Sequence, residues 1–461
     1  MYYLMPAIFI LGIIAIALED TIRVNKSATA LFMCITLWLM LAFDAQHIFV
    51  ERENPDFMQF VTQTELGTFP VKDQITKYLT EKAFVPHLGD VAQTLFFVMC
   101  SLLIVNIVDK HGGFLAISQV LRTENKRKLL WMIGLSSFFF SALLDNLAAA
   151  IVLIAVLRKL VPDHTDRMKY AGIIILAANA GGSWSPIGDV TTLLLWTGGN
   201  ITAWHQISHL FLPALANLLV SLSIAHFWLF KKGTTLRQSS DVSSDDLYVE
   251  RIPNKSRIII FWIGILSLAF VPVFQAITHL PAFMCVLIGL VFLWIYTDLM
   301  YGKIDEIRDS DKLRIPKLSR SVDLPTIFFF LGILMSVAAL NVGGQLTLFA
   351  DVLSSNIKEP YAISVISGAI SSVVDNVALV AATMGMYPII PGDLFFAADG
   401  GFWTLLAYCA VTGGSIFIIG SATGVAVMGL EKISFGYYLK RFTPLATLGY
   451  VAGILLFLVF N

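Results

Sequence analysis

Three aspartates stand deep within apolar stretches of this sequence: Asp145, Asp189 and Asp375. A charged side chain at the centre of a bilayer costs about 3 kcal/mol or more, so such a residue indicates a functional site by default. No lysine or arginine falls in the interior of the predicted membrane spans, so these carboxylates have no ion-pair partner there. A buried carboxylate must then be neutralised by a proton or by a bound cation. A site that alternates between these two occupants would exchange cations for protons.

Oxygen-bearing side chains surround these aspartates and favour a hard cation. The candidate ion-binding and proton-binding residues are Asp145, Asn146, Asn179, Asp189, Thr191, Thr192, Asp375, Asn376, Ser415, Ser421 and Thr423. A set of ligands that is rich in oxygen and lacks sulfur and imidazole suits Na⁺ or Li⁺. We expect the three aspartates to hold this cation. Small hydroxyl residues are also common where transmembrane helices pack closely, so each one alone has a structural interpretation.

Two apolar segments, about 170–197 and 402–429, contain residues that interrupt helices. These residues are Gly181, Gly182, Pro186 and Gly188 in the first segment, and Gly413, Gly414 and Gly420 in the second. Glycine permits unusual backbone angles, and proline lacks a backbone donor. A break at membrane depth leaves free carbonyl oxygens at the end of a half-helix, where their partial negative charge favours a cation.

The composition places these residues in a polytopic all-α membrane protein. The chain has 461 residues, of which 57% are hydrophobic and 14% charged, with a net charge of −1 and a mean hydropathy of +0.77. Soluble domains carry about 25% charged residues. The near-zero net charge argues against a nucleic-acid partner, and the scattered cysteines indicate neither disulfides nor zinc. No cofactor is expected.

Ten segments have about the 20 apolar residues that a membrane span requires. They lie near residues 1–18, 28–50, 91–109, 170–197, 206–230, 256–276, 281–300, 324–342, 402–429 and 440–460. The first is interpreted as a span and not as a cleaved signal, because it lacks a basic amino-terminal region. Two more stretches, about 129–157 and 360–387, are long for one span and short for two, which favours re-entrant hairpins over single tilted helices.

The distribution of basic residues supports the hairpins. Lysine and arginine concentrate in cytoplasmic loops. With two hairpins, 26 of the 31 basic residues fall on one side of the membrane, whereas two single crossings would give a split of 20 against 11. This topology puts both termini outside and the polar linker, 231–255, in the cytoplasm. We expect a bacterial inner membrane.

The sequence repeats itself at offsets of 230 to 233 residues. "SALLDNLAAAIVLIAV" (141–156) resembles "SSVVDNVALVAATMGM" (371–386), and "GGSWSPIGDVTT" (181–192) resembles "GGSIFIIGSATG" (413–424). We therefore predict two inverted-topology repeats of five spans each, 1–230 and 256–461, each with one re-entrant hairpin and one interrupted helix. Secondary transporters commonly have this construction, with the ion site near the midplane at the repeat interface.

These motifs resemble those of the NhaD-type sodium/proton antiporters of the ion transporter superfamily. The resemblance covers nearly the whole chain and implies a homodimer with elevator-type movement. Related dicarboxylate carriers have Ser-Asn-Thr at the hairpin tips where this chain has Asp-Asn, which disfavours an anionic substrate. The family's binding residues correspond to Asp145 and Asn146, Asn179, Asp189, Thr191 and Thr192, Asp375 and Asn376, and Ser415.

The resulting hypothesis is exchange of Na⁺ or Li⁺ for H⁺ by alternating access across the lipid bilayer, serving pH and salt homeostasis. Asp145 and Asp189 would be the principal ligands and proton carriers, with Asp375 contributing from the second half. One alternative is a carrier of the same fold for a dicarboxylate, arsenite or another anion. A more remote alternative is an intramembrane aspartyl protease, which would leave the duplicated Asp-Asn pairs unexplained.

Overall fold

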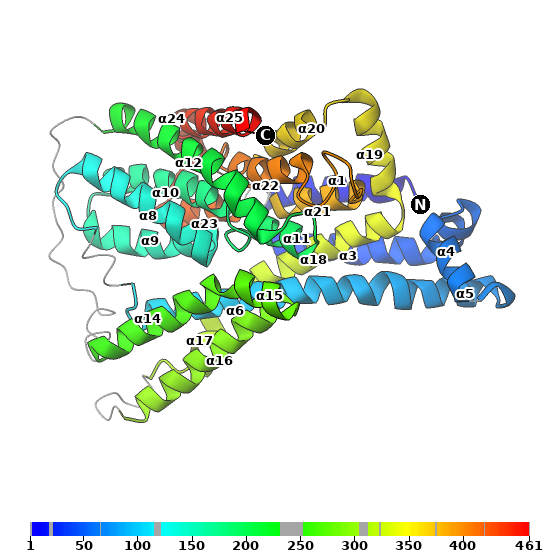
Figure 1. Ribbon diagram of the computed structural model, residues 1–461, viewed down its shortest axis with the longest axis horizontal. Coiled ribbons are helices and arrows are strands. Elements are labelled where there is room, and N and C mark those ends of the chain that lie inside the picture. Colours follow the sequence, from blue (N-terminus) through cyan, green and yellow to red (C-terminus); the bar gives the residue numbers. More distant parts are fainter. Residues whose placement is uncertain are drawn as a thin grey trace. The chain divides into compact units, whose positions relative to one another are not determined.

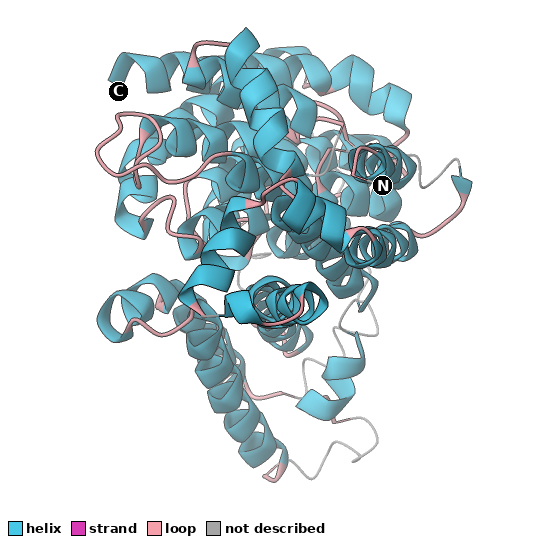
Figure 2. Ribbon diagram, turned by 90° about the vertical axis from the view of Figure 1, so that its right-hand side faces the viewer, coloured by secondary structure: helices cyan, strands magenta, loops and turns pink. Residues whose placement is uncertain are grey.

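The computed structural model consists of helices and connecting loops. It describes residues 2–17, 22–64, 66–114, 121–230, 252–303, 312–321, 324–373, 376–418 and 420–460. Throughout these residues every regular element is a helix, as Figure 2 shows. The expected all-α polytopic fold is therefore confirmed.

Seven helical segments within the described ranges are long and apolar enough to cross a membrane. They are α3 (Lys26–Phe43), the continuous segment Val71–Lys110 containing α5 (Val71–Tyr78) and α6 (Val85–Lys110), α8 (Lys126–Leu144), α12 (Ala203–Trp228), α16 (Ala282–Tyr301), α18 (Leu324–Val342) and α25 (Thr443–Phe460). An eighth candidate combines α14 (Asn254–Ala269) and α15 (Val271–Thr278), which meet at a bend of 48°. The amino-terminal helix, α1 (Leu4–Ala17), is shorter than the expected span.

The first hairpin and the two interrupted helices predicted from the sequence are present. The first hairpin consists of α8 and α9 (Asn146–Leu160), which pack against each other. The helix α8 is long enough to cross, but the chain turns back at Asp145. The first interrupted helix is α10 (His164–Ser183) and α11 (Val190–Thr197), and the second is α22 (Gly401–Gly413) and α23 (Ala422–Glu431).

The second hairpin position contains two short helices, α20 (Pro360–Ser371) and α21 (Asn376–Met386). With 12 and 11 residues, neither reaches the length of about 20 that a membrane span requires. Asp375, the acidic residue predicted at this turn, lies outside the described residues.

The chain divides into two compact units. Unit 1 comprises Met1–Phe96, Asp323–Ile363 and Val377–Ile390; unit 2 comprises Phe97–Val322, Ser364–Asn376 and Pro391–Asn461. Each unit combines parts of both halves of the sequence, so the repeat boundaries at 230 and 256 stay a prediction.

Unit 1 is organised around the packing of α3 against α18. The indole Nε1 of Trp38 donates to the carbonyl of Met335 at 2.9 Å, and a Cβ on Gly332 would lie 2.6 Å from the backbone of Ala30. The unit also contains α19 (Gln345–Asn356) and α4 (Pro55–Gln63), which lie outside the spans and hairpins predicted from the sequence. Asn54 caps α4 by accepting from the Phe57 N–H at 3.1 Å.

Unit 2 is built around α10, in which every residue from Tyr170 to Ser183 is buried. Figure 1 shows α8, α9, α10 and α12 side by side. The helices α8, α9 and α10 all pack against one another, and α12 packs against α8 and α10. Phe138 of α8, Leu153 of α9 and Leu218 of α12 belong to the same apolar core. A helix enclosed on all sides can hold polar side chains at fixed positions away from water. The shorter α17 (Ile315–Leu318) and α24 (Phe435–Arg441) complete the unit.

Candidate cation site

Each hairpin is attached to an interrupted helix by a serine. In the first half of the sequence, Ser141 Oγ donates to the carbonyl of Ala178 at 2.5 Å. In the second half, Ser371 Oγ donates to the carbonyl of Ala410 at 2.7 Å. Both serines lie four residues before an aspartate in the repeated motif, and both donate to a carbonyl oxygen at the same repeat position. The two repeated motifs therefore make corresponding contacts within unit 2.

The glycines of the interrupted helices allow this close attachment. A Cβ on Gly181 would lie 2.1 Å from the Phe138 carbonyl oxygen, and a Cβ on Gly413 would lie 2.0 Å from the Gly368 carbonyl oxygen. These distances are far below van der Waals contact. Neither glycine has a positive φ, so the expectation that they supply unusual backbone angles is wrong. They are required because hairpin and helix backbones approach each other closely.

The same correction holds for the remaining glycines of the breaks. A Cβ on Gly182 would meet the Gly188 carbonyl at 2.5 Å, and one on Gly414 would meet the Gly420 carbonyl at 3.0 Å. In each break the backbone therefore lies against the end of the half-helix that precedes it. Pro186 lies in the first break, between α10 and α11.

Asp145 forms the tip of the first hairpin, where it ends α8 and begins α9. Its backbone has φ 82° and ψ 148°, a region that costs a non-glycine residue about 1–3 kcal/mol and is found mainly at functional sites. The carboxylate partly offsets this cost by accepting the Leu147 N–H at 2.9 Å. The backbone N–H of the next residue, Asn146, donates to the Gly188 carbonyl at 3.0 Å. The hairpin tip thus meets the break of the first interrupted helix.

Asp189 begins α11 and accepts several hydrogen bonds while only 3% exposed. Its Oδ1 accepts the Thr191 N–H and the Thr191 hydroxyl, both at 2.8 Å. Its Oδ2 accepts from the Asn146 amide, and the Asn376 amide donates to it at 3.2 Å. Because donors converge on both oxygens, the surroundings suit an ionised carboxylate.

Asn179 connects this carboxylate network to the second interrupted helix. Its Oδ1 accepts from Asn146 Nδ2 at 3.1 Å. Its Nδ2 donates to Ser415 Oγ at 2.8 Å and to Ser421 Oγ at 3.0 Å. All four side chains are buried, so the network joins the hairpin tip, α10 and the second break in a water-poor environment.

A cavity of about 10 Å³ lies between Asp145 and Asp189. This volume admits about one water-sized particle. Ser101 of α6 and Leu268 of α14 are among the described residues that line it, and no lysine or arginine is among them. Both carboxylates line this cavity, so their negative charges face the same small volume. Such a cavity can accept a single small cation or a proton.

Comparison with known proteins identifies the family. The family model described as "Citrate transporter" matches residues 11–401. Sodium/proton antiporter 1 of Arabidopsis thaliana is 36% identical over 455 residues, covering 98% of this chain and 72% of that protein. The Na(+)/H(+) antiporter NhaD of Alkalimonas amylolytica is 27% identical over 482 residues, covering 99% of this chain and 90% of that protein. The chain belongs to the NhaD-type antiporters. As a member of this family of transporters it is not an enzyme, which removes the protease alternative.

A solved structure supports the fold. The crystal structure of the Alcanivorax borkumensis YdaH transporter, described as having an unusual topology, aligns with a TM-score of 0.56 at 13% identity. The alignment covers 93% of this chain and 98% of that one. At this identity the likeness concerns the fold alone.

Most of the residues predicted for the site in this NhaD-type chain are brought together in unit 2. Thr192 is buried, but its hydroxyl donates to the Asp189 backbone carbonyl at 2.9 Å and not to the carboxylate. Thr423 is also buried, and among the described residues its hydroxyl finds no hydrogen-bond partner. Within the described ranges no three His, Cys, Asp or Glu side chains are grouped to hold a metal. The predicted Na⁺ ligands other than Asp375 are thus two carboxylates with neutral oxygens around them.

Three serines that contribute to the site, Ser101, Ser141 and Ser371, were not among the residues predicted from the sequence. Ser141 and Ser371 open the two repeated motifs, so their matching positions could have revealed them. Ser101 lies in an ordinary apolar helix, and its own hydroxyl donates to the Phe97 carbonyl at 2.8 Å. Only the folded arrangement shows that it lines the cavity.

Proposed function

We propose that this chain exchanges Na⁺ for H⁺ across a membrane, with Asp145 and Asp189 binding the two ions in alternation. The observation that carries the proposal is the pair of carboxylates lining one cavity of single-ion size. The names of the relatives, sodium/proton antiporters of a plant and of bacteria, support the same pair of ions.

The competition between the ions follows from electrostatics. Two adjacent carboxylates that are both ionised repel each other and are poorly solvated in a cavity of this size. Either a bound Na⁺ or a bound proton relieves this repulsion. The cavity has no room for both a hydrated cation and a protonated carboxyl group. Binding of one ion therefore releases the other.

The hydrogen-bond network supports unequal roles for the two carboxylates. Asp189 accepts donors from Asn146, Asn376 and Thr191, which favour its charged form. Asp145 accepts the Leu147 N–H and stands at the strained hairpin tip. We infer that Asp189 is the fixed negative charge of the site and Asp145 is the group that carries the proton.

Citrate is the second candidate substrate, because the matching family model bears that description. A tricarboxylate would need basic residues or many free donors and a much larger volume. The described lining of the cavity contains two carboxylates and no basic residue, which favours a cation.

Everted vesicles provide the test. Addition of NaCl to energised vesicles should dequench a pH-sensitive dye, and Asp145→Asn should abolish the response. Asp90→Asn serves as the control, because Asp90 is an exposed carboxylate and is not among the residues that line the cavity. A response that survives Asp145→Asn, or one that requires citrate in place of Na⁺, would refute the assignment. LiCl in the same assay tests whether Li⁺ is also a substrate.

The remaining features of the proposal concern the assembly and its movement. We propose a homodimer with alternating access by elevator-type movement, both termini outside and the linker 231–255 cytoplasmic, as the resemblance and the distribution of basic residues suggest. The bacterial inner membrane is the proposed location. Epitope tags at the termini and in the linker, probed in intact and permeabilised cells, test this orientation.

A further inference from the structure

Three helices of unit 2 are joined to one another at the ends that carry the ion site. Asn146 begins α9, Asn179 lies on α10, and Ser421 caps α23. The Asn179 side chain bonds to both of the others. Each of the three helices packs against the other two. Their relative positions therefore decide how the polar network is arranged.

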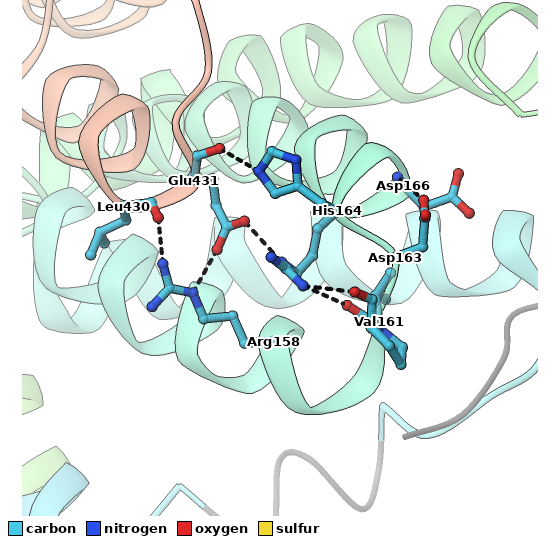
Figure 3. Close-up of polar contacts among 9 residues, drawn as sticks. Arg158, Val161, Asp163, His164, Asp166, Leu430 and Glu431 are labelled. Atoms are coloured by element: carbon cyan, nitrogen blue, oxygen red, sulfur yellow. Dashed lines mark hydrogen bonds and ion pairs between the residues drawn. The ribbon is translucent and has the colours of Figure 1, made fainter. Parts of the chain in front are cut away.

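The same three helices are joined again at their opposite ends, around Glu431 (Figure 3). Glu431, at the end of α23, accepts from Arg158 Nε of α9 at 2.6 Å and from Arg167 Nε of α10 at 2.9 Å. The Arg158 guanidinium also donates to the Leu430 carbonyl, and His164 Nε2 lies 3.0 Å from the Glu431 carbonyl oxygen. We call Arg158, Arg167 and Glu431 the clamp.

The clamp is built for rigidity. The Glu431 side chain is 0% exposed, whereas Arg158 remains 46% exposed. Both carboxylate oxygens are paired with a guanidinium, and such charge-assisted bonds are short and directional. Removing one member of a buried ion pair leaves an uncompensated charge, which makes the arrangement sensitive to substitution.

The clamp lies at a comparable distance from the site along each helix. Asn146 and Arg158 are 12 residues apart, as are Arg167 and Asn179, which corresponds to about 18 Å of helix at 1.5 Å per residue. Ser421 and Glu431 are 10 residues apart, or about 15 Å. A helix cannot slide along its axis when it is held at both ends. The clamp therefore maintains the relative heights of Asn146, Asn179 and Ser421.

We propose that Glu431 is a positioning residue for cation binding, acting through Arg158 and Arg167 to keep the three site-bearing helices in register. This inference rests on the proposed function. It predicts that loosening the clamp weakens cation binding at a site about three helical turns away, while the steps that limit the maximal rate are unaffected.

The full-length protein in proteoliposomes tests this inference. Glu431→Gln should raise the Na⁺ concentration for half-maximal proton movement by roughly fivefold to tenfold, with the maximal rate within about twofold of wild type. Arg167→Gln should have a similar effect. The double variant should not exceed the larger single effect, because both substitutions break one contact. Lys440→Gln is the matched control, since Lys440 is an exposed residue of the nearby α24.

Hydrogen exchange of the same variants separates this inference from the proposed function. Glu431→Gln should accelerate amide exchange at the beginnings of α9 and α23, where the site residues lie. If the wild type moves no protons in response to Na⁺ but the exchange change is seen, the proposed function fails and the mechanical connection stands. If the wild type is active and Glu431→Gln leaves both half-saturation and exchange unchanged, the inference is overturned. Should Glu431→Gln fail to fold, Arg158→Gln replaces it, because Glu431 then retains Arg167.

Discussion

The two interrupted helices of unit 2 share their attachment to a hairpin and differ in charge. Each second half-helix begins at a side chain that caps it. Asp189 accepts the Thr191 N–H at 2.8 Å, and Ser421 accepts the Gly424 N–H at 3.1 Å. The two caps occupy corresponding positions of the internal repeat, yet only the first is a carboxylate.

A second difference lies one helical segment earlier. Asn179 of α10 corresponds to Val411 of α22, so the polar group that reaches across the site exists in one half only. Its amide donates to both Ser415 and Ser421 of the other half. The duplicated backbone contacts thus place two equivalent helix ends, while a few side chains decide which end holds the charge. The second half supports the site through hydroxyl groups.

Substitution of Asp189 tests the charge difference most severely. Asp189→Asn retains a capping oxygen for α11 but removes the negative charge toward which Asn146 and Asn376 donate. Loss of one member of a buried charged network costs about 3 kcal/mol or more, so exchange should fall by roughly 100-fold. The measurement is the initial rate of Na⁺-induced dye dequenching in vesicles. The equivalent change in the other half, Ser421→Ala, should reduce the rate far less. Equal losses would contradict the unequal roles.

Substitution of Asn179 by valine, the residue at the corresponding position of the other half, tests the hydrogen bonds that Asn179 makes across the site. Asn179→Val removes one hydrogen-bond partner each from Asn146, Ser415 and Ser421, and a buried polar group that is left unsatisfied costs about 1–3 kcal/mol. The Na⁺ concentration for half-maximal exchange should therefore rise by roughly tenfold. Asn217→Val is the control, because the Asn217 amide donates to the Tyr408 hydroxyl at 3.1 Å on the same unit. It should lower thermal stability without changing the half-saturation; a tenfold change there would show that the effect is not specific to the site.

The shared attachment predicts equal sensitivity in the two halves. An alanine at Gly181 or at Gly413 would force its Cβ onto a hairpin carbonyl, and overpacking of this kind costs about 1–3 kcal/mol. Both variants should lower the melting temperature of the detergent-solubilised protein by similar amounts. Gly436→Ala is the control, because a Cβ there would have no neighbour within 4 Å. If one of the two tight glycines tolerates alanine, the halves are not attached alike.

The fold was largely predictable because membrane burial leaves strong signals in the sequence. The stretch expected as a hairpin at about 129–157 forms α8 and α9, which together run from Lys126 to Leu160. Asp145 and Asp189 were identifiable because a charge in an apolar segment needs a specific reason. The length of α1 and the helix α4 were not predictable in this way, since hydropathy does not register short or amphipathic helices.

The contacts within the site could not be read from the sequence. Nothing in the local pattern indicates that Asn179 bonds to Ser421, 242 residues later, because that pairing arises only when α10 packs against α23. The glycines were located correctly but for the wrong reason, since close backbone approach and unusual φ favour the same residue. The clamp could not be predicted from the sequence, because Arg158, Arg167 and Glu431 look like ordinary charged residues at helix ends.

The clamp adds a third contrast between the halves, which acid titration can sharpen. Glu431 ends α23, whereas the corresponding residue after α11 is Gly199. Burial alone would raise the pKa of Glu431, but the hydrogen bonds and charges of Arg167 and Arg158 outweigh it and hold the pKa below its ordinary value of 4.5. A depressed folded-state pKa means that the stabilisation is complete above pH 4.5 and is lost as the pH falls through the folded-state value.

The melting temperature of the wild type should therefore exceed that of Glu431→Gln by a constant amount from neutral pH down to about pH 5, and the difference should shrink below pH 4.5. Lys440→Gln should follow the wild type throughout. Titration of Glu431 should change transport least of all the effects described, because this carboxylate stays ionised at pH values well above 4.5. A difference that already vanishes between pH 8 and pH 6 would mean that another group titrates within the clamp. The second half would then contribute a pH-sensitive element to a site whose charge the first half supplies.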